Sequence, residues 1–316
     1  MSLDRDYIEK VTGFLTNKPF RDDAGSLEYI GGIVGGEEPS RYSRSPDLWN
    51  AFFTGMGIRA FFSSFDLPPE KSLSRFIRAV FDRPFCLDLT VTSPYKAAAY
   101  GVLADLSGKL VVSDRVHHLR SLNHIIPDFK TGEFFVDSTD GMGMALALGK
   151  RKDLDGSQVL LVGAGGAAAS IGYELARAGA EIFIANIIES DALKLAENLL
   201  KHARPGRKIS AGDWSSIRKE APQSDIIVSA ITVSKPLEEK DMDLLRPDCL
   251  LADTRYGRMA EFAAAAEKTG RSCVDGREML FGQFYYAAEK VGGLLGFDAD
   301  MVKNILKTIE CSFLTS

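Results

Sequence analysis

The sequence contains one glycine-rich turn with the composition of a phosphate-binding loop, Gly-Ala-Gly-Gly-Ala-Ala at residues 163–168. In a G-x-G-x-x-A turn the first glycine allows the sharp reversal and the second lets backbone N–H groups approach a pyrophosphate. The small last residue lets the next helix pack against the strand, and the start of that helix favours an anion. We therefore expect a dinucleotide to contact Gly163, Ala164, Gly165, Gly166 and Ala167.

The segments around this turn have the pattern that such a site requires. Residues 158–162 form a short apolar run typical of a buried parallel strand. Residues 169–178 have apolar side chains at helical spacing, and residues 181–185 read as the next strand, about 20 residues after the turn. The alternative is a glycine-rich turn in an α/β domain that binds no ligand.

Composition favours a small-molecule ligand. The chain has 316 residues, enough for two domains, and its 45% hydrophobic and 26% charged residues are ordinary for a globular protein. The net charge of −5 leaves no basic excess for a nucleic acid or an anionic membrane. No apolar stretch has the length of a membrane span or the flanks of a signal peptide, so we expect a cytoplasmic protein.

Cysteine and histidine do not suggest a metal site. The four cysteines, Cys86, Cys249, Cys273 and Cys311, form no C-x-x-C pair, and we expect free, mostly buried thiols. His117 and His118 fall in a segment that we expect to be a strand, where neighbouring side chains point in opposite directions. They could not bind one ion together, and we expect a metal-independent enzyme.

Strands and helices alternate along the rest of the chain. Before the glycine turn, strands are expected at residues 27–34, 59–65 and 85–91, with helices at 46–58 and 71–81. The fold class is therefore α/β, with an N-terminal α/β catalytic domain and a Rossmann dinucleotide-binding domain. We place the catalytic domain at residues 1–140, completed by 276–316, and the Rossmann domain at 141–275.

Several separate motifs resemble those of the shikimate dehydrogenase family and its quinate dehydrogenase relatives. The resemblance covers residues ~30–295 in the family's order. The matching segments are Tyr42-Ser43-Arg44-Ser45-Pro46, Thr90-Val91-Thr92-Ser93-Pro94-Tyr95-Lys96, Ser121-Leu122-Asn123-His124, Asp137-Ser138-Thr139-Asp140-Gly141, Asp253-Thr254-Arg255-Tyr256 and Asp275–Gln283.

The resemblance implies a role for each motif. Lys96 and Asp140 would be the catalytic pair, because oxidation of an alcohol needs a group that accepts the hydroxyl proton. Ser43 and Ser45 would bind the substrate carboxylate; the alternative is that Ser45 only caps the following helix. The other substrate ligands would be Thr92, Asn123, Tyr256 and Gln283. Met279 would pack against the nicotinamide or simply fill the core.

The sequence departs from the family pattern around the substrate and the cofactor ribose. Thr90, Ser138 and His124 stand where the family has asparagine, asparagine and threonine. Asn186 and Ile187 occupy the cofactor position where NADP-using relatives have asparagine and an arginine that would bind the 2′-phosphate.

We therefore expect NAD to be preferred over NADP. Glu189 and Asp191 follow Ile187 closely and would repel a phosphate. One alternative keeps NADP possible, since Arg204, Arg207 or Lys208 from the next loop could supply the missing cation.

The implied function is an NAD(P)-dependent oxidoreductase that interconverts a ring hydroxyl and a ketone on a cyclic hydroxy-carboxylic acid. The changes around the substrate also fit quinate or an aminoshikimate. A non-catalytic dinucleotide- or ligand-binding regulator with the same fold is the alternative from another class. The expected partner is a small cyclic carboxylic acid, without nucleic acid or membrane, and the protein is expected to be a monomer or a homodimer.

Overall fold

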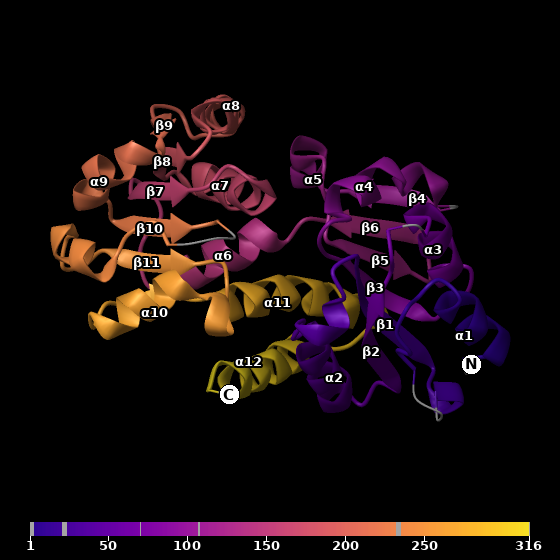
Figure 1. The fold of residues 1–316 in the computed structure, drawn as a ribbon. Coiled ribbons are helices and arrows are strands. Elements are labelled where there is room, and N and C mark those ends of the chain that lie inside the picture. Colours follow the sequence, from indigo (N-terminus) through magenta and orange to yellow (C-terminus); the bar gives the residue numbers. More distant parts are fainter. Residues whose placement is uncertain (1–2, 21–23, 70, 107, 232–234, 316) are drawn as a thin grey trace. The chain divides into compact units, whose positions relative to one another are not determined.

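The computed structural model describes residues 3–20, 24–69, 71–106, 108–231 and 235–315. The chain divides into two compact units (Figure 1). The first unit contains Met1–Thr139 and Phe284–Ser316, and the second contains Asp140–Gln283. The sequence-based division groups residues 276–283 with the first unit, whereas their contacts place them in the second.

The first unit is built on a six-stranded sheet with the order β2-β1-β3-β5-β6-β4. Its second strand in space, β1, pairs in parallel with both β2 and β3, whereas β5 is antiparallel to β3 and to β6. The strands are β1 (Tyr29–Gly35), β2 (Ala60–Asp66), β3 (Cys86–Val91), β4 (Lys109–Val112), β5 (His124–Asp128) and β6 (Glu133–Asp137).

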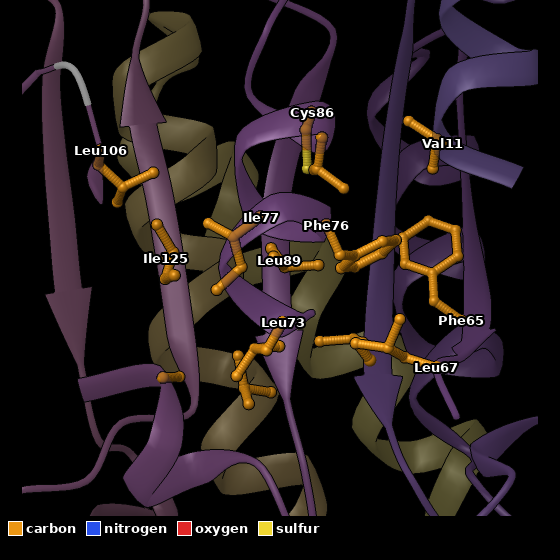
Figure 2. Close-up of a cluster of buried hydrophobic side chains, with 14 of the residues drawn as sticks. Val11, Phe65, Leu67, Leu73, Phe76, Ile77, Cys86, Leu89, Leu106 and Ile125 are labelled. Atoms are coloured by element: carbon orange, nitrogen blue, oxygen red, sulfur yellow. The ribbon is translucent and has the colours of Figure 1, made fainter. Parts of the chain in front are cut away.

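An apolar cluster covers one face of this sheet (Figure 2). Phe65 of β2 packs edge-on against Phe76, with 5.7 Å between the ring centroids, and Leu89 and Ile125 belong to the same cluster. Burial of this surface is the main favourable term in folding of the unit. The helices of the first unit are α1 (Arg5–Thr12), α2 (Ser45–Met56), α3 (Leu73–Val80), α4 (Lys96–Gly101), α5 (Asp114–Leu119), the second part of α11 (Gly276–Leu295) and α12 (Ala299–Thr315).

The second unit contains a sheet with the order β12-β11-β10-β7-β8-β9, all of whose pairs are parallel. This is a doubly wound arrangement, in which ligands bind beyond the carboxyl ends of the strands. Its strands are β7 (Gln158–Val162), β8 (Glu181–Asn186), β9 (Ile209–Asp213), β10 (Ile226–Ser229), β11 (Leu250–Asp253) and β12 (Cys273–Val274). Its helices are α6 (Asp140–Gly149), α7 (Gly166–Ala178), α8 (Glu189–Leu200), α9 (Ile217–Glu220), α10 (Glu261–Lys268) and the first part of α11.

One segment differs from its expected structure. His117 and His118 lie on helix α5, not on a strand. The helix follows Ser113, a residue type that favours helix starts, and ends at Arg120, which adopts a left-handed conformation with φ of 48°. The two side chains therefore do not point to opposite faces of a strand, contrary to the expectation from the sequence, although both are exposed. Within the described residues no group of three or more His, Cys, Asp or Glu could hold a metal ion.

The free cysteines agree with the sequence analysis. Cys86 and Cys249 are buried, Cys273 is half-buried and Cys311 is exposed, and none is paired. Burial raises the pKa of Cys249 to about 11 and that of Cys273 to about 12. Where the chain is described, none of its helices combines the length and apolarity that crossing a membrane requires.

Candidate functional site

Thr92 and Lys96 lie between the end of β3 and the start of α4. The Thr92 N–H donates to the Val34 carbonyl at 2.9 Å, which extends the β1–β3 pairing by one residue. The Tyr95 hydroxyl donates to the Leu67 carbonyl at 2.8 Å. These bonds hold the turn that presents Lys96 as the first residue of its helix.

Two glycines at the end of β1 allow the loop that leads to Ser43 to contact the turn that precedes Lys96. A Cβ at Gly35 would lie 2.6 Å from Thr92 Cγ2 and 3.4 Å from Pro39 Cδ, and one at Gly36 would lie 2.8 Å from Pro94 Cδ. The Pro39 carbonyl in turn accepts a hydrogen bond of 2.9 Å from the Ser43 N–H. The absence of a side chain at Gly35 and Gly36 therefore lets the two predicted substrate-binding segments pack together.

Ser43 and Ser45 lie at the start of α2. The helix begins at Ser45 with Pro46 as its second residue, and the residue at the N-cap position is Arg44, which makes no side-chain cap. The Ser43 hydroxyl oxygen accepts from the Ser45 N–H at 3.2 Å. The alternative that Ser45 caps this helix is therefore wrong, because Ser45 is already inside it.

Asn123 connects the lysine segment to the motif that contains Asp140. The Leu122 N–H donates to the Lys96 carbonyl at 3.2 Å. The side chain of Asn123, which is buried, accepts from the Thr139 N–H at 2.8 Å and donates to the Thr139 hydroxyl at 3.1 Å. Asp140 is the next residue along the chain.

Asp137 stabilises the start of the same motif. Its carboxylate accepts two hydrogen bonds from Arg115 Nη1, at 2.8 and 2.9 Å, and one from the Ser113 hydroxyl at 2.6 Å. The Ser138 N–H donates to it at 2.7 Å. Arg115 was not among the predicted site residues, although a charged residue beside His117 and His118 was a signal that this segment is not a buried strand.

In the second unit, small residues bring α6 and α11 into close contact. A Cβ at Gly143 would lie 2.3 Å from the Met279 carbonyl oxygen and 2.8 Å from the Gln283 nitrogen, and one at Gly282 would lie 2.6 Å from Gly143 Cα. Asp140 is the first residue of α6. The structure therefore groups the helix that starts at Asp140 with the helix that carries Met279 and Gln283.

Tyr256 lies in the loop after β11. The Arg255 carbonyl accepts from the Gly276 N–H at 2.9 Å, which places this loop at the start of α11. The fully buried Asp253 accepts from Arg255 Nε at 3.2 Å and from the Phe262 N–H at 3.1 Å. Tyr256 and Gln283 thus come from neighbouring segments of the same unit.

The glycine turn has the geometry that a phosphate site needs. Gly163 has φ of 114°, and a Cβ there would lie 2.6 Å from the Ala230 carbonyl oxygen, so only glycine fits. Helix α7 begins at Gly166 without a side-chain cap, and a Cβ at Gly165 or Gly166 would meet no atom within 4 Å. The turn therefore has open space at Gly165 and Gly166, and no side chain caps the first N–H groups of α7, which fits the phosphates of a dinucleotide.

The end of β8, beside this turn, is apolar and acidic. Ile187 is 71% exposed, and the Asn186 side chain donates to the Ile188 carbonyl at 3.1 Å. Asn186 pairs with Asp213, the last residue of β9. Hydrogen bonds from Ser215 and Ser216 hold the pKa of Asp213 below its usual value, so its carboxylate is charged at neutral pH.

Arg204 and Arg207, which could replace the missing cation, lie at the amino ends of the strands, opposite the glycine turn. Arg204 Nη1 and Arg207 Nη2 contact Asp155 at 3.1 and 2.7 Å, and Arg204 Nε donates to the carbonyl of Arg177 near the end of α7. Asp155 precedes β7, whereas the glycine turn follows it, about 17 Å away along a strand of this length. Lys208 also lies at the amino ends of the strands, since its carbonyl accepts a hydrogen bond from the Ile182 N–H near the start of β8.

A buried polar cluster also lies at the end of β3. The Asp88 carboxylate contacts His124 Nδ1 at 2.8 Å and accepts from the Thr90 hydroxyl at 2.6 Å. Thr90 and His124 are two of the departures from the family pattern, whereas Asp88 was not predicted from the sequence. An aspartate inside an otherwise apolar strand was the signal that could have found it.

Comparisons with known proteins show which family this chain resembles. Residues 145–246 match the family profile described as shikimate / quinate 5-dehydrogenase. A curated shikimate dehydrogenase (NADP+) from Methanopyrus kandleri is 30% identical over 267 residues, which cover 82% of this chain and 88% of that protein.

Two solved structures have a similar fold. Shikimate 5-dehydrogenase from Listeria monocytogenes, in complex with shikimate and NAD, has a TM-score of 0.69 and 25% identity, covering 92% of this chain and 100% of that chain. The enzyme from Thermus thermophilus, in complex with NADP(H) and shikimate, has a TM-score of 0.68 and 25% identity, covering 89% and 99%.

Proposed function

The chain belongs to the shikimate and quinate dehydrogenase family of NAD(P)-dependent oxidoreductases, and we propose that it interconverts a ring hydroxyl and a ketone on a cyclic hydroxy-carboxylic acid of the shikimate type. In this proposal the first unit binds the acid and the second binds the nicotinamide dinucleotide. The observation that carries the proposal is the hydrogen-bonded connection from Lys96 through Leu122 and Asn123 to Thr139, which Asp140 follows.

Lys96 and Asp140 would handle the proton of the reacting hydroxyl. The dinucleotide, when bound, supplies the hydride acceptor or donor. Lys96 accepts the hydroxyl proton during oxidation and returns it during reduction, and Asp140 orients the lysine and the hydroxyl. A binding protein without catalysis has no use for such a pair, which favours an enzyme over a regulator.

The remaining site residues would bind and orient the acid. Ser43 and Ser45 offer two hydroxyl groups at the start of α2, where a carboxylate is favoured without a buried cation. Thr92, Asn123, Tyr256 and Gln283 would contact ring hydroxyl groups, and Met279 would pack against the nicotinamide. The Thr90 hydroxyl is already bonded to Asp88. In relatives with asparagine at this position, the side chain can contact a ring substituent that Thr90 would contact differently. This difference suits a ring acid related to shikimate, such as quinate or an aminoshikimate.

We expect NAD to be preferred, although the curated relatives are named for NADP+. Two observations support this: Ile187 is exposed where an arginine would bind the 2′-phosphate, and acidic residues lie nearby, since Asp213 pairs with Asn186 and the first turn of α8 contains Glu189 and Asp191. Arg204 and Arg207 are paired with Asp155. Loss of a charge-assisted contact costs about 1.5–3 kcal/mol, so we expect a preference of about tenfold or more.

The experiment that tests the proposed function is a turnover screen. Shikimate, quinate, and their amino and deoxy analogues are each assayed with NAD and with NADP. Turnover of at least one acid is expected, with a higher kcat/KM for NAD. Tight binding of an acid and a dinucleotide without turnover would instead identify a regulator.

The cofactor preference has its own test in an Ile187→Arg variant. The ratio of kcat/KM for NADP to that for NAD should rise by about tenfold. Leu193→Arg, which adds the same charge at an exposed site further along α8, is the matched control and should leave the ratio unchanged. Equal or better use of NADP by the native protein would contradict the proposal.

A further inference from the structure

A buried polar cluster joins β3 to β5. Its three members are Asp88 and Thr90 on β3 and His124 on β5. Asp88 is fully buried, and Thr90 and His124 are 7% and 3% exposed. A carboxylate accepts hydrogen bonds, so His124 Nδ1–H donates to one of its oxygens and the Thr90 hydroxyl to the other.

The cluster lies on the face of the sheet opposite the apolar cluster. Leu89 pairs with Ile125, and both belong to the apolar cluster (Figure 2). Successive side chains of a strand point to opposite faces, so Thr90 and His124 point away from it. The pairing of β1 with β3 also shifts by one residue between Ile30 and Gly32, which places Asp88 next to an irregularity of the strand.

The junction that this cluster spans is short. In the described part of the chain, two residue pairs join β3 to β5, Leu89 with Ile125 and Thr90 with His124. A buried carboxylate costs free energy unless its oxygens are hydrogen-bonded, so the arrangement that keeps both donors in place is strongly favoured. The bond between His124 and Asp88 therefore reinforces a junction that has few backbone pairs, and the bond from Thr90 within β3 holds the Asp88 carboxylate in place.

Residues of the proposed site lie directly beyond this junction. The Val91 N–H donates to the Asn123 carbonyl at 2.8 Å, and the Leu122 N–H donates to the Lys96 carbonyl at 3.2 Å. Any slippage of β3 against β5 would change the distance between Asn123 and Lys96. We propose that Asp88, Thr90 and His124 are positioning residues that hold Asn123 against the Lys96 turn.

The kinetic consequence rests on the proposed function, whereas the structural consequence does not. Small displacements of reacting groups reduce turnover strongly, so loss of the cluster should lower kcat more than it raises KM. The carboxylate would still be bound by Ser43 and Ser45, which lie outside the cluster. Independently of any substrate, the amides of Val91 and Leu122 should exchange with solvent faster when the cluster is broken.

The test compares three variants of the full-length protein. His124→Leu removes the ring donor, and Thr90→Val removes the hydroxyl donor with little change of shape. His124→Asn retains a donor at the position of Nδ1. For His124→Leu we expect kcat to fall at least tenfold and KM to change less than threefold, with Val91 and Leu122 exchanging at least tenfold faster. Thr90→Val should show the same effects at least threefold, and His124→Asn should stay within threefold of the native protein.

Tyr7→Phe is the matched control. It removes a buried hydrogen bond of 2.7 Å to the Val80 carbonyl elsewhere in the first unit. It should lower stability without accelerating exchange at Val91 or Leu122. Equal acceleration in Tyr7→Phe, or native exchange in both His124→Leu and Thr90→Val, would overturn the proposal. Native kcat in an active enzyme that carries either cluster variant would also overturn it, whereas a native protein inactive on every acid contradicts only the proposed function.

Discussion

Lys96 and Asp140 are the residues to which the proposed proton transfer assigns a chemical role. Lys96→Ala and Asp140→Ala should each reduce kcat about 10²-fold or more, the usual size of a general acid–base contribution. Lys109→Ala is the control, because Lys109 pairs with Glu133 at 2.7 Å on the surface and should not affect turnover. Near-native kcat in both site variants, with the true substrate, would remove this pair from the mechanism.

Ser43 should act through substrate affinity. Its hydroxyl oxygen accepts from the Ser45 N–H, so its hydrogen remains available to a substrate carboxylate. Ser43→Ala should therefore raise KM by a larger factor than it lowers kcat. Ser40→Ala is the comparison, since the Ser40 hydroxyl bonds to Asp66 and its loss should affect stability but not KM. An unchanged KM for Ser43→Ala would leave that serine with only a structural role.

The crossing of α6 and α11 connects helix packing to the site. Gly143→Ala would place a methyl group 2.3 Å from the Met279 carbonyl oxygen, so the helices must separate. We expect a loss of about 1–3 kcal/mol in the free energy of unfolding, measured with urea, and displacement of Met279 and Gln283. Gly293→Ala in α11 is the control, because a Cβ there meets nothing within 4 Å and alanine favours the helix. Equal stability of the two variants would show that α6 and α11 are not in close contact.

Local sequence pattern predicted most elements but not their pairing. The strand at residues 158–162 has the predicted bounds, and the long apolar helices were found with shifts of a few residues. The antiparallel direction of β5 and the helical state of α5 were missed. Both depend on contacts with residues distant in the chain, such as the pairing of β5 with β3 and the bonds from Arg115 to Asp137. A periodicity within one segment contains no information about such partners.

The charge distribution of the molecule predicts that the folded state is less stable at acidic pH. Among the described residues, hydrogen bonds from basic side chains, from hydroxyl groups or, for Asp128, from the Lys130 backbone N–H lower the pKa of six carboxyl groups below their ordinary values of 4.5 for Glu or 3.8 for Asp. They are Glu28, Asp82, Asp128, Asp213, Glu239 and Asp248. A lowered pKa in the folded state contributes stability that is present above the unfolded value and is lost as pH falls through the folded value. We therefore expect the midpoint of thermal unfolding to decline below about pH 4.5.

Asp82 offers a specific check of this pH dependence. It contacts Lys10 of α1 at 2.8 Å on the surface. Asp82→Asn should lower the midpoint slightly at about pH 7, and the difference from the native protein should shrink as pH falls through the lowered pKa of this carboxyl group. Burial raises the pKa of Glu278, which acts in the opposite direction and makes the onset of the decline shallower. A difference between the variant and the native protein that does not shrink as pH falls would refute an electrostatic origin.

The sequence by itself determined the α/β class, the glycine turn and the motifs of the candidate site, because each depends on residues close together in the chain. Tertiary structure alone decided that Thr90 and His124 bond to Asp88. It also decided that Arg204 and Arg207 pair with Asp155 at the amino ends of the strands, opposite the glycine turn. These outcomes depend on which strands pair with each other and on whether a loop lies at the amino or the carboxyl ends of the strands. Burial and long-range hydrogen bonds set those relations only when the whole chain folds.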